Sequence, residues 1–246
     1  MKNKLKKELI EFKLLLRGVP SVMLTLFVLS VFSMNLFANK SISLPFDFLA
    51  LDCGIIFSWF AFLAMDVITK HFGPKGASEI SIFAMLINLA FCFVFFIGSA
   101  VPGVWGESFV EGSENVINAA LDGTFGGTWY VILGSALAFT VSAFVNNFSN
   151  YAVGKAFRNN PDGALAYVAR TYISTAIGQF CDNMVFALAV SHVFFGWTLL
   201  QCVTCALTGM AAELLCEVIF SFIGFRHCKK WKEEEVGKEY LERIAK

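Results

Sequence analysis

Apolar residues along this chain are gathered into six long segments that are separated by shorter polar stretches. The segments run approximately Val19–Ala38, Phe48–Ile68, Ser78–Ala100, Thr128–Asn146, Ala164–Val190 and Phe194–Gly224. Each segment approaches or exceeds the roughly 20 residues that an α-helix needs to cross a bilayer. All five prolines stand at or near segment ends, where helices begin or loops run. The pattern predicts an all-α integral membrane protein with six transmembrane helices.

Composition supports the membrane interpretation. Apolar residues make up 57% of the 246 residues and charged residues only 15%, whereas soluble domains carry roughly 25% charged residues. Seven cysteines lie mostly inside the apolar runs, where a thiol usually serves as a small apolar group. Cys202 and Cys205 form a CxxC pair with no histidine or second pair nearby, so we expect no metal site and no cofactor.

The basic residues predict the orientation of the chain. If both termini lie on one side, seventeen of the 19 lysines and arginines lie there, and the opposite side holds only Lys40. The positive-inside rule then places both termini in the cytoplasm. We predict three parts: a basic, amphipathic cytoplasmic segment (1–18), a six-helix transmembrane domain (19–225) and a charged cytoplasmic tail (226–246). The first part is expected to be a helix on the lipid surface, with an ordinary charged tail as the alternative.

The fifth apolar segment carries an unusual number of polar groups for a membrane span. They are Arg170, Thr171, Ser174, Thr175, Gln179, Asp182 and Asn183. At about 100° per residue, Thr175, Gln179, Asp182 and Phe186 share a stripe roughly 60° wide. Lipid tails cannot solvate such groups, so the stripe must face a partner, a water-filled cavity or a polar ligand. It predicts a binding surface, with Trp59 and Glu213 as facing groups at similar depth.

A second set of polar positions lies toward the predicted cytoplasmic side. It comprises Asp66, Lys70, Asn147, Asn150 and Arg170. We interpret this set as a polar gate below the ligand site and expect Arg170 to pair with Asp66. For the asparagines, hydrogen bonding between packed helices is an equal alternative. For Asp52, which precedes Trp59 by seven residues, the alternative to a ligand contact is a helix cap at the membrane surface.

Two stretches resemble a known family. DVITKHFGPKGA (Asp66–Ala77) and RTYISTAIGQFCDNMVF (Arg170–Phe186) are similar to the VUT family (YhhQ type) of queuosine-precursor transporters. The specific part is the series Arg170, Ser174, Gln179, Asp182 and Phe186. The chain departs from the family at Lys70, where many members carry an acidic residue. The resemblance implies uptake of 7-deazaguanines (pre-queuosine bases, queuine or queuosine) across the cell membrane, and a fold related to S-components of energy-coupling-factor transporters.

The chemistry of the polar residues fits such a substrate. A carboxylate accepts the two N–H donors on the pairing edge of a deazaguanine, an amide N–H meets its O6, and an aromatic ring stacks on the base. The expected substrate contacts are Asp182, Gln179, Glu213, Trp59, Phe186, Thr175 and Asn147. The expected gating or structural polar residues are Arg170, Asp66, Ser174 and Asn150.

Three alternatives remain open. An S-component for another vitamin-like molecule would need a coupling ATPase, but the first span lacks the Ala-xxx-Ala pair by which S-components bind that module, so a transporter working alone is favoured. An intramembrane enzyme with an Asp66–Asp182 dyad is disfavoured because no GxGD sequence surrounds either aspartate. A membrane scaffold would leave the stripe unexplained. We expect a small-molecule substrate and the bilayer as partners, and no nucleic acid.

Overall fold

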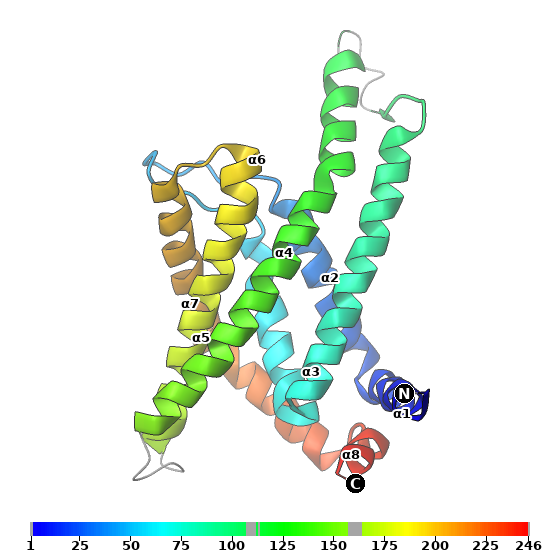
Figure 1. The fold of residues 1–246 in the computed structure, drawn as a ribbon, viewed down its shortest axis with the longest axis vertical. Helices are drawn as coiled ribbons and strands as arrows, with labels where there is room; N and C mark the ends of the chain where they lie inside the picture. Colours follow the sequence, from blue (N-terminus) through cyan, green and yellow to red (C-terminus); the bar gives the residue numbers. More distant parts are fainter. Residues whose placement is uncertain (1, 107–111, 113, 157–163, 246) are drawn as a thin grey trace. The chain divides into compact units, whose positions relative to one another are not determined.

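The computed structural model describes residues 2–106, 112, 114–156 and 164–245, and the side chains at 2, 3, 114, 147, 150, 151, 154, 164–171 and 221 lie outside that description. Helices make up 85% of the structure, which confirms the all-α prediction. In chain order they are α1 (Lys2–Gly18), α2 (Ser21–Phe37), α3 (Ile55–Ala100), α4 (Glu114–Ala156), α5 (Ala164–Phe186), the π-helix η2 (Ala187–His192), α6 (Val193–Phe195), α7 (Leu199–Glu233) and α8 (Lys238–Ile244) (Figure 1).

Several of these helices meet the length and hydropathy that membrane crossing requires. Four do so by themselves, and α1 with α2, which meet at 101°, make a fifth if the bent pair is counted as one span. The protein is therefore a multi-pass membrane protein. The predicted count of six spans and the side of the termini stay predictions.

A break inside α3 supports the prediction of separate second and third spans. Gly73 has φ 80° and ψ 168°, and Figure 1 shows the ribbon descending to this point (cyan) and rising again after it (teal). A residue before proline avoids the helical region, and glycine adopts positive φ without a steric penalty. Nothing lies within 4 Å of a Cβ built at Gly73, so the glycine is needed for its conformation and not for space.

Two of the apolar segments become helical only after their first residues. The second apolar segment becomes helical at Ile55 and not at Phe48, and the sixth at Leu199 and not at Phe194. Asp52 Oδ1 accepts a hydrogen bond from the Gly54 N–H at 2.7 Å, a turn that ends the irregular stretch before α3. The N-cap residue of α3 is Gly54, and the helix start has no side-chain cap hydrogen bond, so Asp52 closes the turn before the helix and does not cap the helix itself. Gly196, with φ 71°, ends α6 in the left-handed conformation that commonly closes a helix.

The chain divides into two compact units. The first unit comprises Met1–Ser33, Ile56–Asn88 and Cys216–Lys246, and the second comprises Met34–Ile55 and Leu89–Leu215. The first unit therefore holds α1, most of α2, the part of α3 around its break, the end of α7 and α8. The second unit holds α4, α5, η2, α6 and the start of α7.

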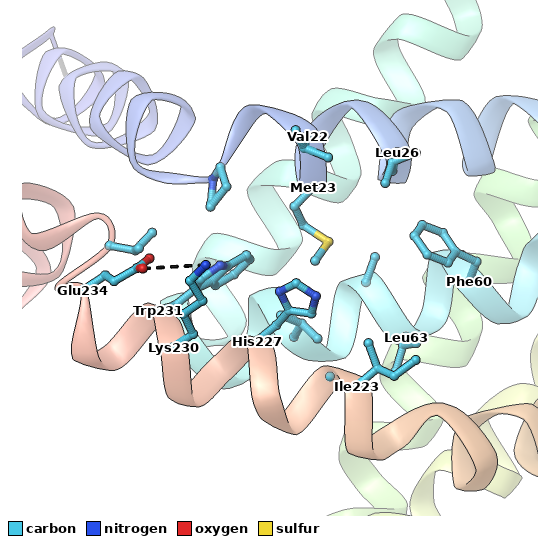
Figure 2. Close-up of a pocket in the computed structure, with 15 residues that line it drawn as sticks. Val22, Met23, Leu26, Phe60, Leu63, Ile223, His227, Lys230, Trp231 and Glu234 are labelled. Carbon is cyan, nitrogen blue, oxygen red and sulfur yellow. Dashed lines mark ion pairs between the residues drawn. The ribbon is translucent and has the colours of Figure 1, made fainter.

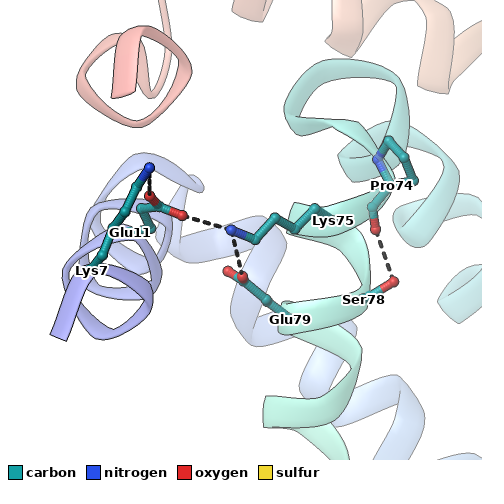
Figure 3. Close-up of polar contacts among 6 residues, drawn as sticks. All are labelled: Lys7, Glu11, Pro74, Lys75, Ser78 and Glu79. Carbon is teal, nitrogen blue, oxygen red and sulfur yellow. Dashed lines mark hydrogen bonds and ion pairs between the residues drawn. The ribbon is translucent and has the colours of Figure 1, made fainter. Parts of the chain in front are cut away.

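In the first unit, the two ends of the chain pack beside the α3 break. Tyr240 of α8 is fully buried and Phe72 is 1% exposed, with 6.0 Å between their ring centroids. Lys75, just after the break, holds α1 through an ion pair of 2.6 Å with Glu11 and also pairs with Glu79 at 3.7 Å (Figure 3). The hydrogen bond from Lys75 keeps the pKa of Glu11 below its ordinary value. This contact fastens the N-terminal helix to α3.

In the second unit, α4 and α5 pack along each other (Figure 1). Beyond α5, two small apolar clusters form the core. One gathers Ala50, Ala187, Trp197, Cys202 and Cys205. The other gathers Ala38, Val131 and Val190. Ala50 belongs to residues 38–54, the connection before α3. This irregular stretch is therefore part of the core of its unit.

Candidate functional site

The polar side of α5 is held between two other helices of the second unit. Ser142 of α4 donates its hydroxyl hydrogen to Asp182 Oδ1 at 3.0 Å. At the next residue, the Asn183 amide Nδ2 donates to Glu213 Oε2 of α7 at 3.1 Å. Consecutive helical residues point about 100° apart, so this side of α5 contacts α4 with one residue and α7 with the next.

Two glycines permit these close approaches. A Cβ built at Gly178 would lie 3.2 Å from Asn146 Cβ on α4. A Cβ built at Gly209 on α7 would lie 2.9 Å from Asn183 Nδ2. Neither position can take a larger residue unless the facing amide moves. The amides of Asn146 and Asn183 therefore lie directly against the backbones of neighbouring helices.

Gln179 is a buried residue of this face whose side-chain amide has no hydrogen-bond partner among the described residues. Its side chain is 4% exposed, and neither Oε1 nor Nε2 has a hydrogen-bond partner in the described part of the chain. Asn146 Oδ1, which lies against the adjacent Gly178, is also buried without a partner there. Leaving a buried amide unpaired costs about 1–3 kcal/mol per group. Such groups require an explanation, and a bound ligand or water supplies one.

The two carboxyl groups of the face add acceptors. Asp182 accepts one hydrogen bond from a neutral hydroxyl, and Glu213, 3% exposed, accepts one from a neutral amide. A carboxylate has about four acceptor positions. A carboxylate inside a membrane costs about 3 kcal/mol on insertion scales unless it is paired. Asp182 in particular retains acceptor capacity for donors on a ligand.

The connection before α3 packs against α7 and against the end of α5. Thr204 Oγ1 on α7 donates to the backbone oxygen of Phe48 at 2.7 Å, and Gln201 Nε2 donates to that of Asp47 at 2.9 Å. Leu51 and Met184 pack against the same apolar cluster. Because Met184 directly follows Asn183, the connection covers the end of α5 next to the polar face.

The remaining predicted residues fall into three groups. In the second unit, Phe186 packs against the Val131–Val190 cluster one turn from Asp182, Ser174 is buried and Thr175 is half-buried. The backbones of Asn147 and Asn150 lie in α4 and that of Arg170 in α5, but their side chains lie outside the described residues. Their contacts stay predictions.

Trp59 and Asp66 belong to the first unit. The Trp59 ring stacks on Phe220, with centroids 4.7 Å apart and planes at 24°. The carboxyl groups of Asp66 and of Glu217 on α7 are close neighbours, and two carboxyl groups can form a hydrogen bond only if one of them holds a proton. The placement of Trp59 opposite the α5 stripe and the pairing of Asp66 with Arg170 join residues of different units, and both stay predictions.

Sequence reasoning predicted Gln179, Asp182 and Glu213 as substrate contacts, and that role stays a prediction; it named neither Ser142 nor a carboxyl partner of Asp66. A lone serine in an apolar span carries no signal, because serine also fits a helix–helix contact as a small residue. Glu217 was visible as an intramembrane acid one turn after Glu213, and it was the available signal for a carboxyl pair.

These features define a multi-pass helical membrane protein with a buried, partly unsatisfied polar face. A family model described as "putative vitamin uptake transporter" matches residues 52–225, which is well over half of the chain. The protein belongs to this family of uptake transporters, which confirms the resemblance at the level of the family. No curated protein and no solved structure shows a significant match.

Proposed function

We propose that this protein takes up queuosine precursors, the 7-deazaguanines that include pre-queuosine bases, queuine and queuosine, across the cell membrane. The observation that carries the proposal is the buried Gln179 amide, which has no hydrogen-bond partner among the described residues. It lies three residues before Asp182, in the α5 series that resembles queuosine-precursor transporters. Family membership supports transport of a vitamin-like molecule. The chemistry of the face supports the narrower substrate class.

Each group on the face has a complementary group on the base. The pairing edge of a deazaguanine offers an N1–H and an exocyclic amine, which Asp182 can accept together, and an O6, which Gln179 Nε2 can reach as donor. Glu213 would receive the amine of an aminomethyl-bearing substrate or a second base donor. Phe186 or Trp59 would cover the ring. A site of this kind discriminates strongly against a base that lacks the hydrogen-bonding groups, because its own buried groups then stay unpaired.

The proposal includes an orientation and a mode of action. Both termini face the cytoplasm, and α1 lies on the lipid surface. The 101° angle between α1 and α2 supports this placement, as do the exposed apolar residues Leu5 and Leu9, 69% and 54% accessible. The protein works in the plasma membrane without a coupling ATPase, and it has no catalytic role.

The test is uptake of labelled pre-queuosine base or queuine by a strain that cannot make queuosine, with tRNA modification as readout. Wild-type protein should restore modification, and Asp182→Asn should reduce uptake about tenfold or more, the effect of about 1.4 kcal/mol. Glu233→Gln makes a comparable acid-to-amide change at a side chain that is 65% exposed and should have no effect. Failure of every deazaguanine to restore modification would reject the substrate class.

The vitamin named in the family description is also compatible with a second candidate, an S-component for another vitamin. The same uptake assay, performed with and without a coupling ATPase module, separates the two. Uptake that needs the ATPase would support the S-component.

A further inference from the structure

A cavity lies in the first unit. It has a volume of about 440 Å³ and lies between the start of α2, the first part of α3 and the end of α7 (Figure 2). Met23, Phe60 and Trp231 contribute one apolar side chain from each of these helices. Ligand pockets in proteins commonly measure about 300–1,000 Å³. The cavity is therefore large enough for part of a ligand, and no residue of the proposed substrate site lines it.

The cavity is apolar both in its depth and along one part of its rim. Its depth is formed by buried residues of α3, among them Leu63 and Val67. Its rim includes Val22 and Leu26 of α2 and Ile223 of α7, whose side chains are 70%, 43% and 38% exposed. In a membrane protein, exposed apolar side chains contact acyl chains. This part of the rim therefore suits an opening toward the hydrocarbon of the bilayer.

The polar side chains of the cavity come from the last turns of α7 and from the residue that follows it. They are His227, Lys230 and Glu234, and Figure 2 shows them along the same side of the cavity. Lys230 pairs with Glu234 at 3.7 Å, but the two side chains are 66% and 55% exposed. An ion pair that is this exposed contributes about 1 kcal/mol or less. A phosphate could therefore compete for the Lys230 ammonium.

The surrounding charge favours an anion. In the last turns of α7 and the turn that follows, basic residues exceed acidic ones by four to three: Arg226, Lys229, Lys230 and Lys232 against Glu233, Glu234 and Glu235. α1, in the same unit, is also rich in lysine. Each lysine or arginine near an anionic membrane surface contributes about 1 kcal/mol of attraction. An apolar cavity with basic residues at its rim is complementary to a molecule that has an acyl chain and an anionic head group.

We propose that this cavity binds one anionic phospholipid. An acyl chain occupies the space between Met23, Phe60 and Trp231, and the phosphate lies at Lys230 and His227. The lipid joins α2, α3 and α7 where these helices meet the membrane surface. This site is independent of the substrate proposed above, and its occupancy can be measured on the protein without any transport assay.

The first experiment measures lipid binding to the full chain in detergent by native mass spectrometry. Phosphatidylglycerol and phosphatidylcholine with identical acyl chains are compared. Wild-type protein should retain one phosphatidylglycerol, and Lys230→Glu should weaken its binding at least about tenfold. Lys229→Glu is the matched control, because Lys229 is 69% exposed and pairs with Glu233 at 3.8 Å but does not line the cavity. Equal losses in the two variants, or equal retention of both lipids, would overturn the proposal.

The second experiment locates the acyl chain. Phosphatidylglycerol with brominated acyl chains should quench a part of the wild-type fluorescence that Trp231→Phe lacks, since Trp231 is only 4% exposed and lines the cavity. Glycerol phosphate, which has the head but no chain, should not displace the lipid. Identical quenching in the two proteins, or displacement by glycerol phosphate, would show that the chain is not in the cavity.

Discussion

The amide of Asn183 on α5 donates a hydrogen bond to the carboxylate of Glu213 on α7 across 3.1 Å. Between membrane helices such a bond contributes about 0.6 kcal/mol on average and about 1.7 kcal/mol at most. The main effect of the Asn183–Glu213 hydrogen bond is therefore to hold the Glu213 carboxylate in place and not to stabilise the fold. It orients one acid of the polar face while Ser142 orients the other, Asp182.

The close approach of α7 to α5 can be tested at Gly209. Gly209→Leu should lower the free energy of unfolding by about 1–3 kcal/mol, because the new side chain meets the Asn183 amide and overpacks the contact. Thermal melting in detergent measures the change. Gly98→Leu is the control, since nothing lies within 4 Å of a Cβ at Gly98, and it should melt close to wild type. A similar loss in both variants would mean that side-chain volume at Gly209 is not the cause.

Gln179 should show opposite effects on stability and on uptake. Gln179→Leu removes a buried amide that makes no hydrogen bond with the described residues, so the protein without ligand should become more stable by up to about 1–3 kcal/mol. Uptake of the deazaguanine should be lost, because the group that reads O6 is absent. Melting and uptake are measured on the same preparation. A destabilised Gln179→Leu protein would show that the amide serves the fold.

The attachment of α1 should depend on pH at both extremes. Glu11 and Lys75 lie outside the predicted spanning segments. The pKa of Glu11 is lowered, first by the hydrogen bond from Lys75, so its contribution is complete above the ordinary value of 4.5 and is lost as pH falls through the lower folded value. The pKa of Lys75 is raised, first by the bond to Glu11, so its contribution is complete below 10.5 and is lost as pH rises through the higher folded value.

Hydrogen exchange of residues 4–18 measures this attachment. Protection should be highest between these limits and fall outside them. Glu11→Gln should reduce protection at neutral pH and remove the acid-side change. Glu8→Gln, at an exposed position of the same helix, is the control and should keep both changes. A wild-type profile in Glu11→Gln would contradict the assignment.

The connection before α3 should control access to two buried thiols. Thr204→Val removes the hydrogen bond to Phe48 and should increase the rate at which Cys202 and Cys205, 0% and 4% exposed, react with a thiol reagent. Mass spectrometry of the peptides resolves these cysteines from the others. Thr124→Val is the control, because the Thr124 hydroxyl donates to the backbone oxygen of Ala120, one turn earlier in its own helix. Unchanged labelling in Thr204→Val would mean that this bond does not hold the connection.

Two apolar segments do not become helical at their first residues, which shows that hydropathy does not distinguish a buried loop from a membrane helix. Phe48–Leu51 is as apolar as a membrane helix, but it is an irregular stretch whose Ala50 is 5% exposed inside a core cluster. Hydropathy measures a preference for burial and not a backbone conformation. An apolar loop that is buried in the protein core therefore has the same hydropathy as the start of a membrane-spanning helix.

The class of this protein and the composition of its polar face follow from the sequence alone. Only helices or closed barrels satisfy backbone groups in lipid, and six long apolar runs indicate helices; the 3.6-residue period places Gln179 and Asp182 on one side of α5. What that side contacts depends on the folded structure. Ser142 lies 40 residues from Asp182 and Glu213 lies 30 from Asn183. Such pairings depend on how separate helices pack, and glycines at 178 and 209 set that packing through the space they leave.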